Sequence, residues 1–365
     1  MAAVAEDHAW MMRALKLALK GRGRTAPNPI VGAVLVRGGR VVGEGWHRVL
    51  GGPHAEVEAL RAAGRKAKGA TLYVTLEPCA HHGRTPPCTE ALIDAGVRRC
   101  VVALRDPHAI VNGRGLRALR AAGVAVELGT GAREVRAELG GYLLVQAEGR
   151  PRVTWKVAAT LDGRIADGAG RSRWITGEPA RRRGHALRAA CDAIVIGAGT
   201  ARADDPRLTA RHARGAHQPL RIVCDTGLRL PATLKLFAPA LARGTVVACG
   251  PAASAARERA LAVRGVTVWR LPLAGAHVSP RALARRLAAA GLHEVLVEGG
   301  AALGTSWMRA GLVSRIALFS APVVLGDGLS WCGPLGRTLA TAPRGTLSRV
   351  ERLGDDVLSW MEVGA

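Results

Sequence analysis

The chain has 365 residues, which is too long for one ordinary hydrophobic core, so we expect two domains. Hydrophobic residues make up 48% of it, which excludes a disordered chain, and seven cysteines without a secretory signal argue against a disulfide framework. The net charge of +24 is spread over both halves and aromatic residues are only 3%, so the composition favours anionic small molecules over nucleic acid as partners.

The N-terminal region and the apolar runs show no targeting pattern. Glu6 and Asp7 stand where a signal peptide would carry a basic region. No apolar run approaches the ~18–20 residues that a membrane span needs. We therefore expect a soluble, cytoplasmic protein with no membrane partner.

Helices and strands alternate along the first half of the chain. Helical periodicity predicts helices over residues 6–20, 54–63, 89–95, 113–122 and 132–146. Strand patterns cover residues 31–36, 40–46, 70–77, 99–104 and 124–128, and the first two flank a Gly38-Gly39 hairpin turn. This order predicts an α/β sandwich that ends near residue 148.

The second half restarts the alternation after residue 149. Strands are expected over residues 153–159, 193–196, 220–224, 245–248, 266–269, 294–297, 315–324 and 357–363. Helices are expected over residues 179–191, 280–290 and 302–310, and residues 163–173 read as a glycine-containing turn. The pattern predicts a second α/β domain over residues 149–365.

A histidine and two cysteines form a candidate metal site. His54 begins a predicted helix, Cys79 follows a predicted strand, and Cys88 opens the next helix. Such a set binds zinc and leaves the fourth tetrahedral position for water. Glu56 is placed to carry protons as general base and acid of a hydrolytic deaminase. Each short pattern alone is compatible with an ordinary helix start, but their order and spacing favour zinc.

The spacing of the two cysteines bears on the substrate. Eight residues separate Cys79 from Cys88, whereas nucleic-acid deaminases have two. The longer loop can supply substrate contacts from His82, Arg84 or Thr85. The spacing argues against a deaminase that edits RNA, which stays the alternative hypothesis. A third possibility is that one half of the chain only scaffolds the other.

Two glycine-rich loops follow predicted strands in the second half. They cover residues 197–209 and 297–304, and the latter leads into a helix. Backbone N–H groups at such a helix start bind phosphate or pyrophosphate. The pair suggests a dinucleotide cleft without naming the nucleotide, while tight helix packing and a capped loop stay open as alternatives.

The first half resembles the deaminase half of the bifunctional riboflavin biosynthesis protein family. The segments that carry the resemblance are residues 25–32 (TAPNPIVG), 53–57 (PHAEV), 75–88 (TLEPCAHHGRTPPC) and 106–107 (DP). The resemblance implies a cytidine-deaminase-like α/β/α sandwich with zinc on His54, Cys79 and Cys88. It also implies that Glu56 shuttles protons and that Asn28 faces the pyrimidine. One departure is His108-Ala109, where the family usually has Asn-Pro.

The second half resembles the reductase half of the same family, which has a dihydrofolate-reductase-like α/β fold and uses NADPH. The matching segments are residues 156–164 (KVAATLDGR), 172–177 (SRWITG), 192–197 (DAIVIG), 203–209 (ADDPRLT) and 297–300 (VEGG). For NADPH the resemblance implies Ala158, Trp174, Thr200, Asp204, Thr226 and the loop residues Gly300, Ala301, Ala302, Leu303, Gly304, Thr305 and Ser306. For the substrate it implies Ser172, Arg188, Leu208, Arg211 and Glu298.

The resemblance implies two successive reactions. Zinc-dependent deamination of 2,5-diamino-6-(5-phosphoribosylamino)pyrimidin-4-one would precede NADPH-dependent reduction of the ribosyl group of 5-amino-6-(5-phosphoribosylamino)uracil. Arg188 and Arg211 suit a phosphate because guanidinium binds its oxygens in a bidentate fork, and Lys156 would polarise the opened sugar. We expect a homo-oligomer that acts on small phosphorylated pyrimidines. The segment Trp331-Cys332-Gly333 matches nothing assignable.

Overall fold

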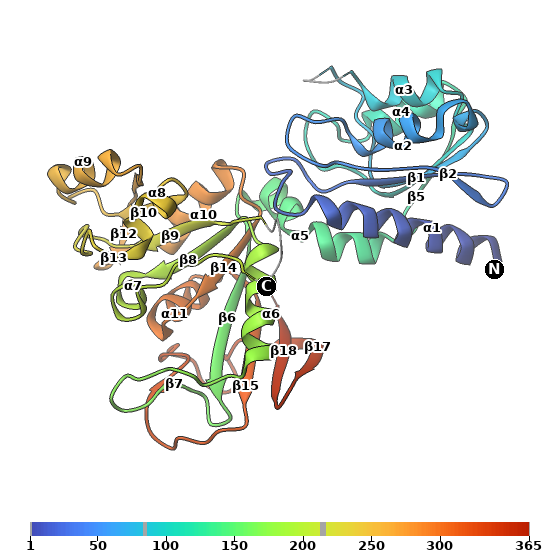
Figure 1. The fold of residues 1–365 in the computed structure, drawn as a ribbon. Coiled ribbons are helices and arrows are strands. Elements are labelled where there is room, and N and C mark those ends of the chain that lie inside the picture. Colours follow the sequence, from blue (N-terminus) through green and yellow to red (C-terminus); the bar gives the residue numbers. More distant parts are fainter. Residues whose placement is uncertain (1, 83–85, 212–216, 365) are drawn as a thin grey trace. The chain divides into compact units, whose positions relative to one another are not determined.

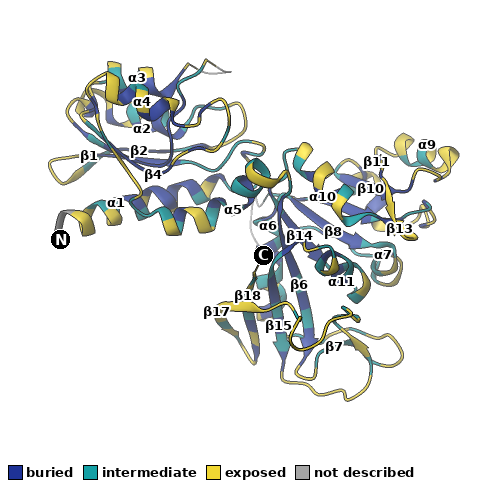
Figure 2. Cartoon of the chain, turned by 180° about the vertical axis from the view of Figure 1, so that it is seen from behind, coloured by how far each residue is buried: buried dark blue, intermediate teal, exposed yellow. Residues whose placement is uncertain are grey.

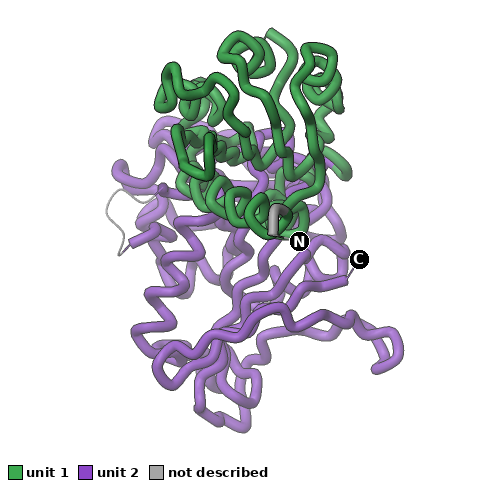
Figure 3. The backbone as a smooth tube through the Cα atoms, turned by 90° about the vertical axis from the view of Figure 1, so that its right-hand side faces the viewer, with its two compact units in different colours: residues 1–148 green, residues 149–365 purple. Residues whose placement is uncertain are grey.

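The chain forms two compact units, residues 1–148 and residues 149–365, which Figure 3 colours separately. The computed structural model describes residues 2–82, 86–211 and 217–364. Within these ranges, no helix combines the length and the apolar character that crossing a bilayer requires.

The first unit is built on a five-stranded sheet in the order β2-β1-β3-β4-β5. Its strands are β1 (Gly32–Arg37), β2 (Arg40–Trp46), β3 (Thr71–Leu76), β4 (Arg99–Leu104) and β5 (Ala125–Leu128). β1 runs antiparallel to β2 and β3, whereas β3, β4 and β5 are parallel. The carboxyl ends of β3 and β4 therefore meet at one edge, where parallel α/β sheets place their chemistry.

Helices cover both faces of this sheet, which confirms the predicted α/β/α sandwich (Figure 1). The helices are α1 (Ala2–Ala18), α2 (Ala55–Ala63), α3 (Cys88–Asp94), α4 (Arg114–Ala121) and α5 (Ala132–Glu148), with 3-10 turns at Leu19–Gly21 and Gly64–Ala67. α1 and α5 pack on one face around Met11 and Leu139. α2, α3 and α4 pack on the other around Leu92 and Leu119.

Glycine in β2 brings α2 close to the sheet. A Cβ atom on Gly45 would lie 2.2 Å from the Ala55 carbonyl oxygen and 2.5 Å from the Ala59 nitrogen. No larger residue fits between the strand and the helix backbone at that distance. The start of α2, which carries the candidate zinc and proton-transfer residues, is thus seated directly on the strand.

The second unit is built on a nine-stranded sheet in the order β11-β10-β9-β8-β14-β6-β15-β18-β17. Its strands are β6 (Arg152–Thr160), β8 (Ala193–Gly197), β9 (Leu220–Cys224), β10 (Thr245–Cys249), β11 (Thr267–Arg270), β14 (Glu294–Glu298), β15 (Val313–Ala321), β17 (Gly345–Leu353) and β18 (Asp356–Val363). Neighbours from β11 to β15 are parallel, and β18 and β17 add an antiparallel edge. Two small ribbons pair β7 (Arg164–Ala166) with β16 (Leu329–Ser330) and β12 (Leu273–Ala274) with β13 (His277–Val278).

Two hydrophobic cores sandwich this larger sheet. The helices are α6 (Glu178–Ala189), α7 (Ala198–Asp204), α8 (Pro239–Ala242), α9 (Ala255–Val263), α10 (Pro280–Ala289) and α11 (Ala301–Arg309), with a 3-10 turn at Lys235–Phe237. α6 and the 3-10 turn contribute Leu187 and Phe237 to one core. α10 and α11 contribute Leu287 and Trp307 to the other. The second predicted α/β fold is confirmed.

The differences from the sequence prediction lie in short or exposed elements. Residues 198–204, expected as loop, form α7, and the predicted turn of residues 163–173 contains the strand β7. α9 was not predicted because it buries no residue and so has no apolar stripe, and Figure 2 shows it largely exposed. β17 was not predicted for the same reason, since most of its residues face solvent.

Candidate active sites

The three expected zinc ligands meet at one place in the first unit. His54 precedes α2, Cys79 follows β3, and Cys88 begins α3; their ligand atoms all lie within 4.8 Å of one another. His54 Nδ1 is 3.2 Å from Cys88 Sγ and 3.6 Å from Cys79 Sγ. A tetrahedral zinc ion with bonds of about 2.0–2.3 Å holds its ligand atoms about 3.5–3.8 Å apart. The distance from His54 to Cys79 falls in this range and that from His54 to Cys88 is slightly shorter, so small shifts of the side chains would let the three donors hold one zinc ion with a fourth position open.

The electrostatics of the two cysteines suit a cation. The backbone N–H of Cys88 donates a hydrogen bond to Cys79 Sγ at 3.4 Å. Hydrogen bonds from the Cys88 side chain, and further from His54 and the Cys88 backbone, outweigh burial and lower the pKa of Cys79 to about 4. The same pairing, with burial, raises the pKa of Cys88. One sulfur is thus readily ionised, as the nucleophilic or metal-binding form of cysteine must be.

Glu56 lies beside these ligands on the first turn of α2. Its side chain is buried, and burial raises the pKa of the carboxyl above its ordinary value despite the opposing charge of His54. A hydrogen bond links it to Cys88. A raised pKa makes the carboxylate a stronger base, which favours uptake of a proton from water at a metal site.

His47, which the sequence did not single out, connects Asn28 to this site. The buried His47 ring lies edge-on to the His54 ring, with centroids 5.5 Å apart. Its Nδ1 is 3.0 Å from the Pro53 carbonyl oxygen and its Nε2 is 3.3 Å from Asn28 Nδ2. Burial lowers the pKa of His47, so the neutral ring donates to Pro53 and accepts from the Asn28 amide. This fixes the orientation of the Asn28 amide.

Glu77 is a second residue that sequence reasoning missed. Its buried carboxylate accepts hydrogen bonds from four backbone N–H groups, those of Asp106, Gly113, Gly115 and Leu116, at 2.9–3.3 Å. The residue stands two positions before Cys79 and so ties the zinc ligand to the start of α4. The sequence signal that could have identified Glu77 is an acidic residue at the end of an apolar strand.

The loop between the cysteines is only partly described. Arg84 and Thr85 lie outside the described residues, and His82 is exposed, with Nε2 3.9 Å from a carboxylate oxygen of Glu90. The buried Asp106 accepts hydrogen bonds from the Tyr142 hydroxyl at 2.7 Å and the His108 N–H at 2.9 Å. Asp106 is thus held by hydrogen bonds in a turn, although His108 replaces the asparagine that is usual in the family.

In the second unit the two glycine-rich loops lie side by side. They follow β8 and β14, which are neighbouring parallel strands, and so emerge at the same edge. A Cβ atom on Gly299, which has φ +85°, would lie 2.7 Å from Thr200 Cγ2. Only glycine allows the second loop to approach Thr200 this closely. The predicted adjacency of the loops follows from the strand order.

The residues expected for NADPH border these loops and the neighbouring strand ends. Thr226 follows β9 and its Oγ1 accepts the Val278 N–H at 3.3 Å, while Asp204 closes α7 and its carbonyl accepts a bond from Arg173 at 3.0 Å. Trp174 is 72% exposed and packs under the Arg181 guanidinium at 4.6 Å. Ala158, Gly300, Ala301, Ala302, Leu303 and Ser306 are half-buried or exposed along β6 and α11.

Gly304 and Thr305 serve packing within the expected NADPH loop. A Cβ atom on Gly304 would lie 1.9 Å from the Trp155 ring, so this glycine lets α11 press against β6. The buried Thr305 hydroxyl accepts the Gly333 N–H at 2.8 Å, and the Trp331 ring lies 5.0 Å from that of Trp155. The unassigned segment of residues 331–333 therefore packs against the middle of α11 and against Trp155 of β6.

A pocket of about 350 Å³ opens between α6 and the strand ends of the second unit. Its lining residues are Lys156, Trp174, Glu178, Arg181, Arg182, Gly184, His185, Arg188, Arg211 and Glu298. Five cationic side chains against two carboxylates make it a site for an anion. Of the expected substrate residues, Arg188, Arg211 and Glu298 line it. Ser172 and Leu208 are described but do not, and the Leu208 side chain is buried in the core with φ +52°.

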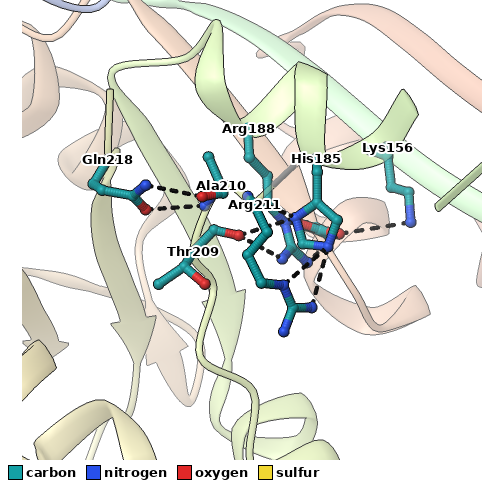
Figure 4. A network of polar contacts seen from close by, with 8 residues as sticks. Lys156, His185, Arg188, Thr209, Ala210, Arg211 and Gln218 are labelled. Carbon is teal, nitrogen blue, oxygen red and sulfur yellow. Dashed lines mark hydrogen bonds and ion pairs between the residues drawn. The ribbon is translucent and has the colours of Figure 1, made fainter. Parts of the chain in front are cut away.

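Figure 4 shows polar contacts among residues that line this pocket and the neighbouring residues Thr209, Ala210 and Gln218. Arg188 Nε and Nη2 each lie 2.8 Å from an oxygen of Glu298, and Lys156 Nζ lies 3.6 Å away from that carboxylate. Burial would raise the pKa of Glu298, but Arg188 and Lys156 lower it to about 2. The bidentate fork expected to bind phosphate at Arg188 is thus occupied by a carboxylate.

Two family models and several known proteins match this chain. Residues 151–359 match the RibD C-terminal domain, and residues 4–104 match the cytidine and deoxycytidylate deaminase zinc-binding region. The riboflavin biosynthesis protein RibD of Aquifex aeolicus is 41% identical, with the match covering 96% of this chain and 97% of that protein. The chain belongs to the RibD family. The resemblance identified in the sequence is thereby confirmed.

Solved RibD structures share the whole fold. RibD of Acinetobacter baumannii, form 1, superposes with a TM-score of 0.90 at 37% identity over 99% of this chain and 100% of that one. The diaminohydroxyphosphoribosylaminopyrimidine deaminase/5-amino-6-(5-phosphoribosylamino)uracil reductase of Thermotoga maritima gives 0.86 at 33% identity with the same coverage. The chain is accordingly a bifunctional RibD enzyme of riboflavin biosynthesis, with a zinc-binding deaminase domain and an NADPH-using reductase domain.

Proposed function

We propose that residues 1–148 deaminate 2,5-diamino-6-(5-phosphoribosylamino)pyrimidin-4-one and that residues 149–365 then reduce the ribosyl group of the product. The observation that carries the first assignment is the convergence of His54, Cys79 and Cys88 beside the buried Glu56. The T. maritima protein with the same fold is named for both activities. The anion pocket beside the glycine loops supports the second assignment.

In the first reaction His54, Cys79 and Cys88 hold the metal and Glu56 moves the protons. Bound zinc supplies the Lewis acidity that makes water nucleophilic at neutral pH. The Glu56 carboxylate takes a proton from the attacking water and gives it to the ring nitrogen. It then takes the second proton from the new hydroxyl group of the tetrahedral adduct and passes it to the amine, and the C–N bond breaks to release ammonia and leave the carbonyl. Asn28, oriented by His47, supplies polar contacts to the pyrimidine.

In the second reaction the pocket residues hold the phosphorylated sugar. NADPH supplies the hydride that reduces its anomeric carbon. Lys156 lies at the pocket floor, held 3.6 Å from Glu298, and is placed to polarise the sugar oxygen as the ring opens. Since Arg188 is engaged by Glu298, we assign the phosphate to Arg211 and Arg181, whose guanidinium groups line the same pocket.

A coupled assay tests both assignments at once. Purified protein loaded with zinc is given the diaminopyrimidinone phosphate and NADPH, and ammonia and NADPH absorbance are followed together. Ammonia should appear first and NADPH oxidation should follow. NADPH oxidation without ammonia release would contradict the order, and oxidation of NADH but not NADPH would contradict the cofactor.

The exposed edge of the large sheet supports a homo-oligomer as a further part of the proposal. β17 ends the sheet and exposes Leu347 and Val350. An exposed edge strand offers unpaired backbone N–H and C=O groups, which are a ready surface for pairing with a second copy. In sedimentation experiments the wild type should form an oligomer, and Val350→Lys should dissociate it. A wild type that stays monomeric at all concentrations would contradict the proposed homo-oligomer.

A further inference from the structure

His185 lies on α6 against the segment that carries Arg211, and its ring is buried. Its Nδ1 is 3.1 Å from the Thr209 carbonyl oxygen. Its Nε2 is 3.3 Å from Arg211 Nε and 3.1 Å from Arg211 Nη2. Figure 4 shows the guanidinium reaching back to this one ring nitrogen.

The chemistry of the partners fixes the state of the ring. A guanidinium is always charged and only donates, so Nε2 must accept. In a neutral imidazole the proton then sits on Nδ1 and is donated to the Thr209 carbonyl at 3.1 Å, while the Arg211 backbone N–H also lies 3.3 Å from Nδ1. A proton on Nε2 would face two N–H groups of Arg211. His185 thus works as a neutral acceptor for a cation.

Other contacts hold the backbone of the Arg211 segment: Arg188 Nη1 donates to the Thr209 carbonyl at 3.3 Å, and the Arg211 N–H lies 3.3 Å from His185 Nδ1. Ala210 is held by Gln218, which accepts its N–H at 3.0 Å and donates to its carbonyl at 2.9 Å. Arg211 itself is exposed, and a long exposed side chain samples many rotamers. The bond to His185 selects one of them and leaves the outer edge of the guanidinium directed to the pocket that both residues line.

We propose that His185 is a positioning residue that fixes the Arg211 guanidinium to receive the phosphate of the reductase substrate. The inference rests on the proposed function of the second unit. It predicts that loss of the Nε2 acceptor weakens binding of the phosphorylated substrate and leaves hydride transfer intact, because preorganisation of an anion clamp lowers its entropic cost.

Two isosteric substitutions separate this role from a purely structural one. Gln places its amide oxygen where Nε2 stands and retains an acceptor for Arg211. Asn places its amide N–H where Nδ1 stands and retains only the bond to Thr209. In His185→Asn the KM for 5-amino-6-(5-phosphoribosylamino)uracil should rise about tenfold, as expected for one hydrogen bond to a charged group. In His185→Gln it should rise less than about threefold.

The phosphate is tested by removing it from the substrate. With 5-amino-6-ribosylaminouracil, wild type and His185→Asn should have the same KM, and the KM for NADPH should be unchanged throughout. His185→Asn should also add little to Arg211→Gln, because residues that act through one another are not additive. KM does not depend on the fraction of folded enzyme, so partial unfolding of a variant leaves the comparison valid.

Equal KM in wild type and His185→Asn would overturn the inference, as would an equal rise with both substrates or a Gln variant no better than Asn. A wild-type enzyme that fails to oxidise NADPH with the phosphorylated substrate would overturn the proposed function, and the inference with it.

Discussion

Arg188 and Glu298 form a two-point ion pair inside the reductase unit, with Nε and Nη2 each 2.8 Å from a carboxylate oxygen. The side chains are only 17% and 12% exposed, so solvent screens the pair weakly. Because the guanidinium fork is already filled, Arg188 stabilises Glu298 as a carboxylate at the pocket floor. The charge of Glu298 therefore contributes to the folding stability of the reductase unit as well as to the electrostatics of its pocket.

That pair makes the stability of the unit depend on acid pH. The pKa of Glu298 is depressed from 4.5 to about 2, so its contribution is fully present above pH 4.5 and is lost as the pH falls toward 2. The shift corresponds to about 3 kcal/mol. Urea unfolding gives the difference in unfolding free energy between wild type and Glu298→Gln. This difference should shrink by about this amount between pH 4.5 and 2. The exposed Glu178→Gln serves as control and should show no such narrowing; a constant gap for Glu298→Gln would contradict the charge assignment.

Glu56→Gln should retain zinc and lose deamination. The amide cannot carry a proton, so the rate should fall by about 10²–10⁴-fold, while reduction of the deaminated substrate continues. Ammonia release, NADPH oxidation and metal content measured on one preparation separate these effects. A variant that deaminates at the wild-type rate would remove Glu56 from the proton transfers.

Cys88→Ser should lose most of its zinc. The hydroxyl of serine is a far weaker zinc ligand than thiolate, and the remaining His54 and Cys79 make an incomplete set. Metal analysis after dialysis provides the measurement. Cys100→Ala is the matched control, because Cys100 is also buried in the first unit but belongs to the core packed by α2 and α3. Full retention of zinc in Cys88→Ser would exclude it as a ligand.

Glu77→Gln should weaken the deaminase unit without touching the metal ligands. Gln presents one acceptor oxygen and one NH₂ group to four N–H donors, so at least two buried amides lose their partner. The expected cost is about 2–4 kcal/mol of unfolding free energy. Thermal and urea unfolding measure it, with the exposed Glu90→Gln on α3 as control. Equal stability of wild type and Glu77→Gln would contradict the stabilising role of these four hydrogen bonds.

The sequence predicted the elements whose pattern is local. Apolar strands and amphipathic helices such as residues 99–104 and 280–289 were found within a residue or two, and the order of His54, Cys79 and Cys88 predicted the ligand cluster. α9 and β17 escaped because they bury almost nothing, and no apolar pattern marks them.

The residues that orient the sites could not be found in this way. His47, Glu77 and His185 act through contacts with residues 19 to 39 positions away in the chain, and nothing in the local pattern of a single histidine or glutamate encodes a distant partner. The same limit explains Arg188. Its guanidinium suits a phosphate, and only the pairing of α6 with the end of β14 shows a carboxylate there.

The seating of α2 on β2 has a consequence for which substitutions the deaminase tolerates. At Gly45 the helix backbone rests on the strand backbone, so the depth of His54 and Glu56 is determined by main-chain contact rather than by the size of core side chains. Exchanging one aliphatic core residue for another should then change stability while leaving the reacting groups in place. A single methyl group at Gly45 would displace them both. Whether a substitution in this unit disturbs the reacting groups thus depends less on its distance from the metal than on whether it changes the contact between α2 and β2.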